Sequence, residues 1–449
     1  MGKINLITHQ AEFCSGFCAY CQARIDDLIS QGFNLNDVEK SLRDINKKNY
    51  ETAKFDFAAL EKKFETHPMM KDKQGSVTLW GADPLGCFDC LQEEVDFIEY
   101  LNREKGYHLG MGLCTNGLGF MIPEWVEFLV KHHIGVSFSH DLLGQEIRTI
   151  KKEFDPMFFD GFDELCRTGQ LGLVSPVLNQ YNSDPVANYH YFEDMVLSKY
   201  PKVQLRLSKS KNGHYDIKTA NRTGICNGKY YEELKDKPYG DMLIHNDLSN
   251  PLLAHQLDIY IDGWKEIYSN PQKYQACWRQ AVKFARLNNG NKPKNPCYNF
   301  QHGITETSYT IDTLGKDCEC MLMDSRAHAQ YPGMSDICKD CKYKGRYECK
   351  ECDVMEPVHA DPTALHQCKF NYRYQELMDF ANAKIDYYEL LERMKKNGNQ
   401  LRQNHNVSGN GNRWGQQTKN RLRSSQSNQR VQCQCKCSTG RTDKPKEQP

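Results

Sequence analysis

The chain has 449 residues, which is long enough for one large domain with a buried core and a smaller second domain. Lys and Arg total 58 and Asp and Glu total 58, and a formal net charge of zero argues against a protein that holds nucleic acid by charge alone. No apolar run approaches the roughly 18 residues of a membrane span, and the start MGKINLITHQ lacks the features of a secretory signal.

The chain contains twenty cysteines. Without an export signal, this number points to thiols that are kept reduced in the cytoplasm and bind metal, rather than to a disulfide framework. Cys166, which has apolar neighbours, is expected to be an ordinary buried side chain.

Predicted strands and helices alternate over the first 210 residues. The chain starts with a short buried strand at 3–9, and charged residues with apolar ones at helical spacing predict a helical insertion at 25–70. Further strands are predicted, with helical segments between the early ones, at 76–80, 109–115, 134–139, 171–178 and 203–208. Six such units predict an α/β fold with a parallel sheet, of the type of a partial (β/α)6 TIM-type barrel. In such a sheet the loops at the carboxyl ends of the strands carry the site.

Three regions follow the predicted barrel domain, 1–210. Residues 211–296 predict a polar, partly helical linking region, and 297–396 predict a small cysteine-rich domain that ends in a helix. From residue 397 the chain is rich in Asn, Gln, Ser, Gly and Arg, which predicts a disordered tail. Between 401 and 449 ten Lys or Arg stand against two Asp or Glu, so the tail is basic.

The loop after the first predicted strand contains Cys14, Cys18 and Cys21. Three thiolates on a [4Fe–4S] cluster leave one of its four irons open to another ligand. The alternative interpretations of these cysteines are a zinc site or a chance grouping. The spacing Cys-x3-Cys-x2-Cys, with Tyr20 before the third cysteine, resembles the motif of radical S-adenosylmethionine (radical SAM) enzymes. The resemblance implies that the open iron binds S-adenosylmethionine and that its reductive cleavage gives a 5′-deoxyadenosyl radical, which abstracts a hydrogen.

Four further stretches resemble that family in order and spacing, over about residues 3–210. LWGADPL (79–85) matches its GGEP-like turn, and LCTNGL (113–118) matches its third-strand TNG. VSFSHDLLGQEIR (136–148) matches its fourth-strand S-x-D-G segment with an arginine, and SPVLNQYN (175–182) matches its fifth-strand segment ending in Asn. In the turn, Ala82 and Asp83 replace the usual Gly-Glu. Carried over, the resemblance implies a set of residues that bind S-adenosylmethionine: Tyr20, Gly81, Ala82, Asp83, Pro84, Asn116, Ser137, Ser139 and Arg148.

A second group of cysteines lies between 297 and 368. Its run CKDCKYKGRYECKEC is CxxC-x7-CxxC, which by itself is a zinc-ribbon candidate. The order of the whole group resembles the SPASM domain, an extension of radical SAM barrels that carries two auxiliary [4Fe–4S] clusters. The resemblance implies one cluster on Cys297, Cys318, Cys320 and Cys352, and another on Cys338, Cys341, Cys349 and Cys368. After the first CxxC, the gaps between successive cysteines are seven and two residues, where the family usually has five and three. A single auxiliary cluster and a zinc site therefore remain as alternatives.

These features predict a radical SAM oxidoreductase that modifies a peptide or protein and takes electrons from a donor such as flavodoxin or ferredoxin, with no membrane partner. One alternative is a radical SAM enzyme that acts on a nucleoside, a nucleic acid or a small molecule, with the basic tail on a phosphate backbone. A second is a zinc or iron–sulfur module without radical chemistry. Cys87 and Cys90, just after the turn at 81–84, are expected near the site as a proton donor, a thiol clamp or packing.

Overall fold

The computed structural model describes residues 2–7, 34, 36–81, 83–147, 152–178, 182–209, 251–287, 308–317 and 376–395. The chain divides into one unit, Met1–Tyr387, and a second, Tyr388–Pro449, of which only 388–395 are described, as the end of a helix. Among the described helices none is long and apolar enough to cross a membrane. Cys14, Cys18, Cys21, all the cysteines of 297–368 and the basic tail fall outside the described residues.

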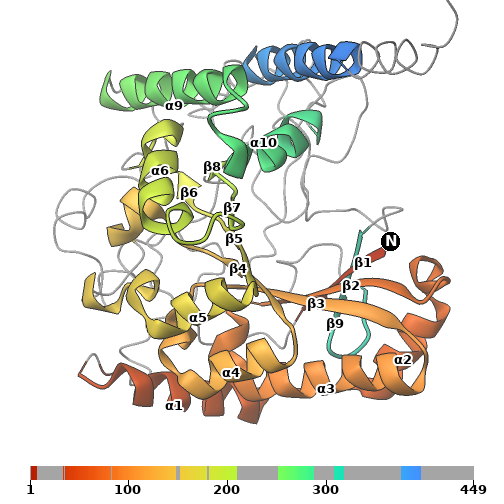
Figure 1. The fold of residues 1–449 in the computed structure, drawn as a ribbon. Coiled ribbons are helices and arrows are strands. Elements are labelled where there is room, and N and C mark those ends of the chain that lie inside the picture. The colour runs from red at the N-terminus through yellow and green to blue at the C-terminus, as the bar shows by residue number, and fades with distance from the viewer. Residues whose placement is uncertain are drawn as a thin grey trace, which may run out of the picture. The chain divides into compact units, whose positions relative to one another are not determined.

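Seven parallel strands form the main sheet, in the order β7-β5-β4-β3-β2-β1-β9 (Figure 1). The strands are β1 (Gly2–Ile7), β2 (Gln74–Trp80), β3 (His108–Thr115), β4 (Gly135–Phe138), β5 (Leu171–Val174), β7 (Gln204–Leu205) and β9 (Ser308–Asp312). From β1 to β5 the spatial order follows the chain order, as in a β/α barrel and unlike a doubly wound sheet, where the order reverses. The predicted α/β fold with a parallel sheet is confirmed.

Two strand predictions differ from the structure. The predicted strand at 171–178 is interrupted after Val174, and its end forms β6 (Val177–Leu178), which pairs with β8 (Ser208–Lys209) in a separate two-stranded sheet. The second difference is β9, which lies in the region predicted as a cysteine-rich domain but pairs along β1, from Lys3 with Ser308 to Ile7 with Asp312. Strand pairing over this sequence separation leaves no local signal, so sequence periodicity does not reveal it.

Helices connect the successive strands of the main sheet. They are α1 (Val38–Thr52), α2 (Phe57–Thr66), α3 (Phe88–Glu104), α4 (Pro123–Lys131), α5 (Asp160–Thr168) and α6 (Pro185–Phe192). Figure 1 shows α3, α4 and α5 along one side of the strands β2–β5. Asp37 and Asp56 begin α1 and α2, where each carboxylate accepts a backbone N–H, from Lys40 at 3.1 Å and from Ala59 at 2.9 Å. On this side, the alternate strand residues Ile4, Val77, Leu79 and Val136 are buried in the core.

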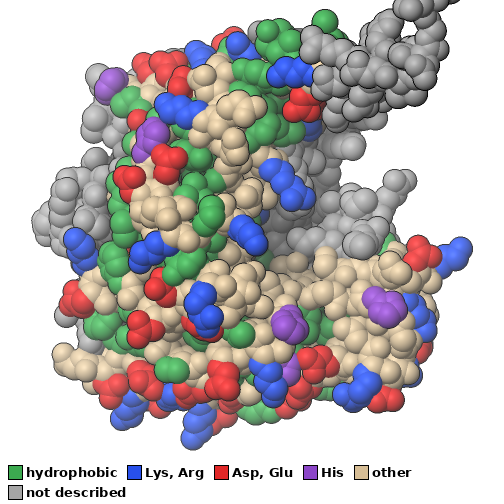
Figure 2. All heavy atoms as spheres, viewed as in Figure 1, with side chains coloured by type: hydrophobic (Ala, Val, Ile, Leu, Met, Phe, Trp, Pro, Cys, Tyr) green, Lys and Arg blue, Asp and Glu red, His purple; other side chains and the backbone are tan. Residues whose placement is uncertain are grey.

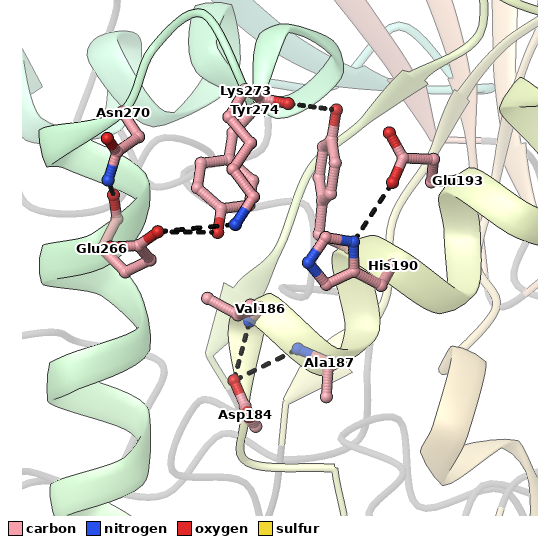
Figure 3. A network of polar contacts seen from close by, with 10 residues as sticks. Asp184, Val186, Ala187, His190, Glu193, Glu266, Asn270, Lys273 and Tyr274 are labelled. Atoms are coloured by element: carbon pink, nitrogen blue, oxygen red, sulfur yellow. Dashed lines mark hydrogen bonds and ion pairs between the residues drawn. The ribbon is translucent and has the colours of Figure 1, made fainter.

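Two helices of the predicted linking region, α9 (Pro251–Ser269) and α10 (Gln275–Leu287), extend this core. At Gly263 a Cβ atom would lie 2.6 Å from Pro185 Cδ, so a larger residue would push α9 away from α6. Polar contacts then join α9 and α6 to the segment just before α10 (Figure 3): Tyr274 donates to Glu266 Oε1 at 3.1 Å, and Tyr189 donates to the carbonyl of Lys273 at 3.2 Å.

Candidate functional site

All strands of the main sheet are parallel, so their carboxyl ends lie at one edge. At this edge β1 ends at Ile7, which is in register with Trp80 at the end of β2. The chain therefore leaves β1 toward the cysteine loop beside the turn at 81–84. The predicted site residues Tyr20, Ala82 and Arg148 lie outside the described residues, as do all the predicted metal-binding cysteines: Cys14, Cys18, Cys21, Cys297, Cys318, Cys320, Cys338, Cys341, Cys349, Cys352 and Cys368.

The turn after β2 is held by its own residues. Asp83 is 1% exposed, and its carboxylate faces the N–H of Leu85 at 3.4 Å, at the start of the short 3-10 helix η2 (Pro84–Cys87). Pro84 occupies the first position of η2, where its fixed φ suits a helix start. The Asp that replaces the family's Glu thus contacts the backbone of the turn.

Two asparagines of α1 hold the far side of this turn. The Asn49 amide donates to the carbonyl of Gly86 at 2.7 Å, and Asn46 Oδ1 accepts the N–H of Asp89 at 2.9 Å, in the first turn of α3. Both asparagines are buried. Helix α1 therefore supports the turn through side-chain hydrogen bonds that were not predicted from the sequence.

The ends of β3 and β4 bring three more polar side chains together. Cys114 Sγ and Ser139 Oγ are 3.2 Å apart, and Cys114 is in register with Ser137. The Ser137 hydroxyl is buried without a hydrogen-bond partner among the described residues. Asn116, by contrast, accepts the N–H of Leu118 at 2.9 Å within its own turn.

These residues belong to one face of the sheet, which we call the polar face: Ser76, Thr78, Gly110, Gly112, Cys114, Gly135, Ser137 and Ser139. They alternate along the strands with the core residues, so their side chains point to the opposite side. The buried Ser137 hydroxyl, which has no hydrogen-bond partner among the described residues, suits contact with a polar ligand, because a buried hydroxyl of this kind needs a partner.

Other buried polar contacts shape the segment after β4. His140 Nε2 lies 2.7 Å from Asp155 Oδ1, and His140 Nδ1 accepts the N–H of Leu142 at 3.0 Å, so both ring nitrogens have a polar partner. Asn182, the last residue of the fifth matching stretch, donates to the carbonyl of Asp141 at 2.9 Å. The pair His140–Asp155 was not predicted, because Asp155 lies outside every matched stretch, although His140 lies within the stretch 136–148.

A cation also lies at this edge. Arg206 follows β7, and its Nε donates to Ser175 Oγ at 2.9 Å, just after β5. The predicted arginine of the site, Arg148, is in the segment that the structure leaves undescribed. Arg206 therefore supplies a described guanidinium at the carboxyl edge that sequence reasoning did not single out.

The described cysteines differ in one respect from the expectation of reduced thiols. Cys87 and Cys90 form a disulfide, with their Cα atoms 5.2 Å apart, whereas Cys114, Cys166 and Cys277 are free. Cys166 is 8% exposed in the hydrophobic core, and burial raises its pKa to about 12. The prediction of an ordinary buried side chain at Cys166 is confirmed.

Comparison with known proteins gives structural neighbours only. No protein-family model matches the sequence, and no curated protein matches it. Among solved structures, anSMEcpe with bound AdoMet and the Cp18Cys peptide is 14% identical at a TM-score of 0.47, over 85% of this chain and 99% of that chain. SuiB of Streptococcus suis, bound to the precursor peptide SuiA, is 12% identical at a TM-score of 0.40, over 81% and 75%. The functional assignment below rests on the sequence motifs and the strand arrangement.

Proposed function

We propose that the chain is a radical SAM enzyme with a SPASM-like extension that modifies a peptide or protein. One observation carries the proposal. The four segments that resemble the family's first four motifs follow β1, β2, β3 and β4, which are neighbours in one parallel sheet and end at one edge. The described strand ends from which these segments start thus lie at one edge, in the order that the family resemblance requires, and this supports the proposal.

In this proposal the predicted site residues have separate roles. Cys14, Cys18 and Cys21 would hold a [4Fe–4S] cluster, and the backbone at Gly81–Pro84, which η2 and Asp83 hold in place, would bind the amino group of the methionine. When bound, S-adenosylmethionine supplies a 5′-deoxyadenosyl radical for hydrogen abstraction. The Ser137 hydroxyl, which lacks a partner among the described residues, would hydrogen-bond a polar group of the ligand on the polar face.

Asn116, Ser139, Tyr20, Ala82 and Arg148 complete the proposed binding residues on the strength of the resemblance. Ser139 is turned toward Cys114, and Asn116 toward its own turn, so both would have to exchange a present contact for the ligand. Arg148 is proposed to bind the carboxylate of S-adenosylmethionine.

The cysteines of 297–368 would hold two auxiliary [4Fe–4S] clusters in the partition that the SPASM resemblance implies. A peptide or protein is the proposed substrate, because that resemblance implies enzymes that modify such molecules, and flavodoxin or ferredoxin is the proposed kind of reductant. On the face drawn in Figure 2 acidic and basic side chains are interspersed, a pattern that does not favour a phosphate backbone as the partner of that face.

The test replaces Cys14, Cys18 and Cys21 together by Ala. After anaerobic reconstitution and reduction with dithionite, the wild-type protein should form 5′-deoxyadenosine and the triple variant should form none. Iron should fall by about four per chain, the content of one cubane, while the auxiliary iron remains. The control is Cys166→Ala, which removes a free thiol from the core and should leave 5′-deoxyadenosine formation unchanged.

Three outcomes would contradict the proposal. Continued 5′-deoxyadenosine formation by the triple variant would show that other residues hold the active cluster. Iron without any cleavage of S-adenosylmethionine in the wild-type protein would indicate a passive iron–sulfur module. Stoichiometric zinc in place of iron would indicate a zinc-binding protein.

A further inference from the structure

The disulfide between Cys87 and Cys90 lies at the start of α3, directly after the turn at 81–84. Cys87 ends η2 and Cys90 lies in the first turn of α3, and they are 1% and 0% exposed. The amino end of a helix carries a partial positive charge, which stabilises a thiolate. This position favours the reduced, ionised form of a cysteine more than the middle of a helix does.

A second buried group lies on the same helix face. Glu94, four residues after Cys90, is 0% exposed, and neither of its carboxyl oxygens has a hydrogen-bond partner among the described residues. Helical side chains four apart are neighbours and lean toward the amino end of the helix, so the Glu94 carboxyl extends over the turn that contains Cys90. Burial raises the pKa of Glu94 well above its ordinary value, so its surroundings favour the protonated carboxyl.

A structural crosslink does not account for these two features together. The bridged cysteines are only three positions apart, and a loop this short constrains the unfolded chain least. A disulfide sulfur also gives Glu94 no hydrogen to accept, and in this oxidised state the carboxyl has no hydrogen-bond partner among the described residues. Reduction would create a thiol donor one helical turn from it.

We propose that Cys87 and Cys90 are a reversible dithiol–disulfide couple that exchanges with a thiol compound, with Glu94 as the proton donor to Cys90. A thiolate of a dithiol reductant attacks Cys87 Sγ, the disulfide bond breaks, and Cys90 leaves as a thiolate that takes the proton of Glu94. The second thiolate of the reductant then attacks the mixed disulfide and releases Cys87, which takes a proton from water. The reductant leaves as a cyclic disulfide, and Glu94 regains its proton from water, so two electrons reach the protein.

The surroundings are suited to keep the couple in place in both states. Asn49 holds the carbonyl of Gly86, next to Cys87, and Asn46 holds the N–H of Asp89, next to Cys90. Neither bond involves a sulfur atom, so both persist after reduction. Because both sulfurs are buried, exchange requires η2 to open, and it is expected to be slower than in an exposed disulfide.

The test follows the redox state of the full-length protein in buffers of dithiothreitol and its oxidised form. After alkylation and trypsin, the peptide 74–103 contains these two cysteines and no other, so its mass reports them alone. We expect a disulfide in the oxidised buffer, two alkylated cysteines in the reduced buffer, and the same transition in both directions without unfolding. The measurement does not involve S-adenosylmethionine, so its result is independent of the proposed function.

Glu94→Gln tests the proton donor, because the amide keeps the shape of the side chain but lacks the acidic proton. Reduction by dithiothreitol at neutral pH should slow about a hundredfold, the lower end of what a positioned proton donor contributes. Asp96→Asn, an exposed change on the same helix, should leave the rate unchanged.

Several results would overturn the proposal. Two alkylated cysteines in the oxidised buffer would show that no disulfide forms in solution. A disulfide that is reduced only after unfolding would be a structural crosslink. A Glu94→Gln rate equal to that of Asp96→Asn would remove Glu94 from the exchange.

Discussion

At the scale of single residues, Glu94 stands out because its burial opposes its charge. The side chain lies on the core face of α3 beside Leu91, Val95 and Ile98, all of them fully buried apolar residues. Desolvation is the cause of its raised pKa, and no cation among the residues that the structure describes offsets it. A carboxyl in such a place makes the folded state bind a proton that the unfolded state releases near its ordinary pKa of 4.5.

The stability of the protein should therefore fall as the pH rises above 4.5 and through the raised pKa of Glu94. Below pH 4.5 the carboxyl is protonated in both the folded and the unfolded state, so its ionisation costs no stability there. At higher pH the unfolded state releases the proton first, and the folded state loses stability relative to it. Glu94→Gln should unfold at higher urea than the wild type at pH 8 and at nearly the same urea at pH 5. The difference is about 1.4 kcal/mol for each unit by which the pKa is raised.

The control for this prediction is Asp96→Asn on the exposed face of α3. Both proteins are compared with Cys87 and Cys90 in the same redox state. An equal advantage of Glu94→Gln at pH 5 and pH 8 would show that the effect comes from packing and not from the proton.

At the scale of elements, β3 and β4 have one face that is apolar and buried in the core and an opposite face that is polar. Leu113 and Val136 point into the core and are 2% exposed, while the residues beside them on the polar face are glycine, cysteine and serine. The core face stabilises the sheet by apolar burial. On β3 and β4 the polar face has small side chains.

Ser137→Val tests this division of the strands. The change removes a buried hydroxyl that has no partner within the described part of the chain, a group that costs about 1–3 kcal/mol when unsatisfied, so stability should stay the same or rise. The affinity for S-adenosylmethionine, measured by calorimetry on the reconstituted protein, should fall about tenfold, the equivalent of one hydrogen bond.

Ser76→Val provides the matched control, because Ser76 is on the same face but exposed, near the amino end of β2. This variant should bind S-adenosylmethionine like the wild type. If Ser137→Val also binds like the wild type, the polar face near β4 does not contact the ligand.

At the scale of the whole molecule, the helix at 376–395 joins the core far from its position in the chain. Four of its apolar residues are buried, and Asn382 donates to the carbonyl of Ala285 at 2.9 Å and accepts from Arg286 at 3.2 Å. The four residues are Leu377, Met378, Ala381 and Ile385. The first half of this helix therefore packs against α10, within the unit Met1–Tyr387.

Two truncations should differ because of this packing. Ending the chain after residue 396 removes the tail, whose composition lacks the aliphatic residues that offset ordering entropy, and should leave Tm and iron content unchanged. Ending it after residue 375 also removes the four buried side chains, each large one worth about 1.5–3 kcal/mol, and should lower Tm by about 5–10 °C. A loss of iron or of folded protein in the chain that ends after residue 396 would show that the tail is structural. An unchanged Tm in the chain that ends after residue 375 would show that the helix does not stabilise the core.

Much of the barrel could be predicted because its signals are local. The alternation of Ser76, Val77, Thr78 and Leu79 marks a strand with one apolar face, and three-residue to four-residue spacing marks α1 and α3. The order of the strands then follows from the preference of parallel β/α units for adjacent, right-handed connections. The carboxyl ends of β1, β2, β3 and β4 lie at one edge for the same reason.

The tertiary structure alone decided which distant groups meet. Thr313 Oγ1 donates to the carbonyl of Lys54 at 2.7 Å across 259 positions, and β9 pairs with β1 across a similar separation. The disulfide at Cys87, the unpartnered carboxyl of Glu94 and the bond from Asn49 to the turn depend equally on how α1, α3 and the sheet pack. Sequence periodicity reports which face of an element is apolar, but the partner of a buried polar group is chosen by packing in three dimensions, where chain distance has no direct meaning.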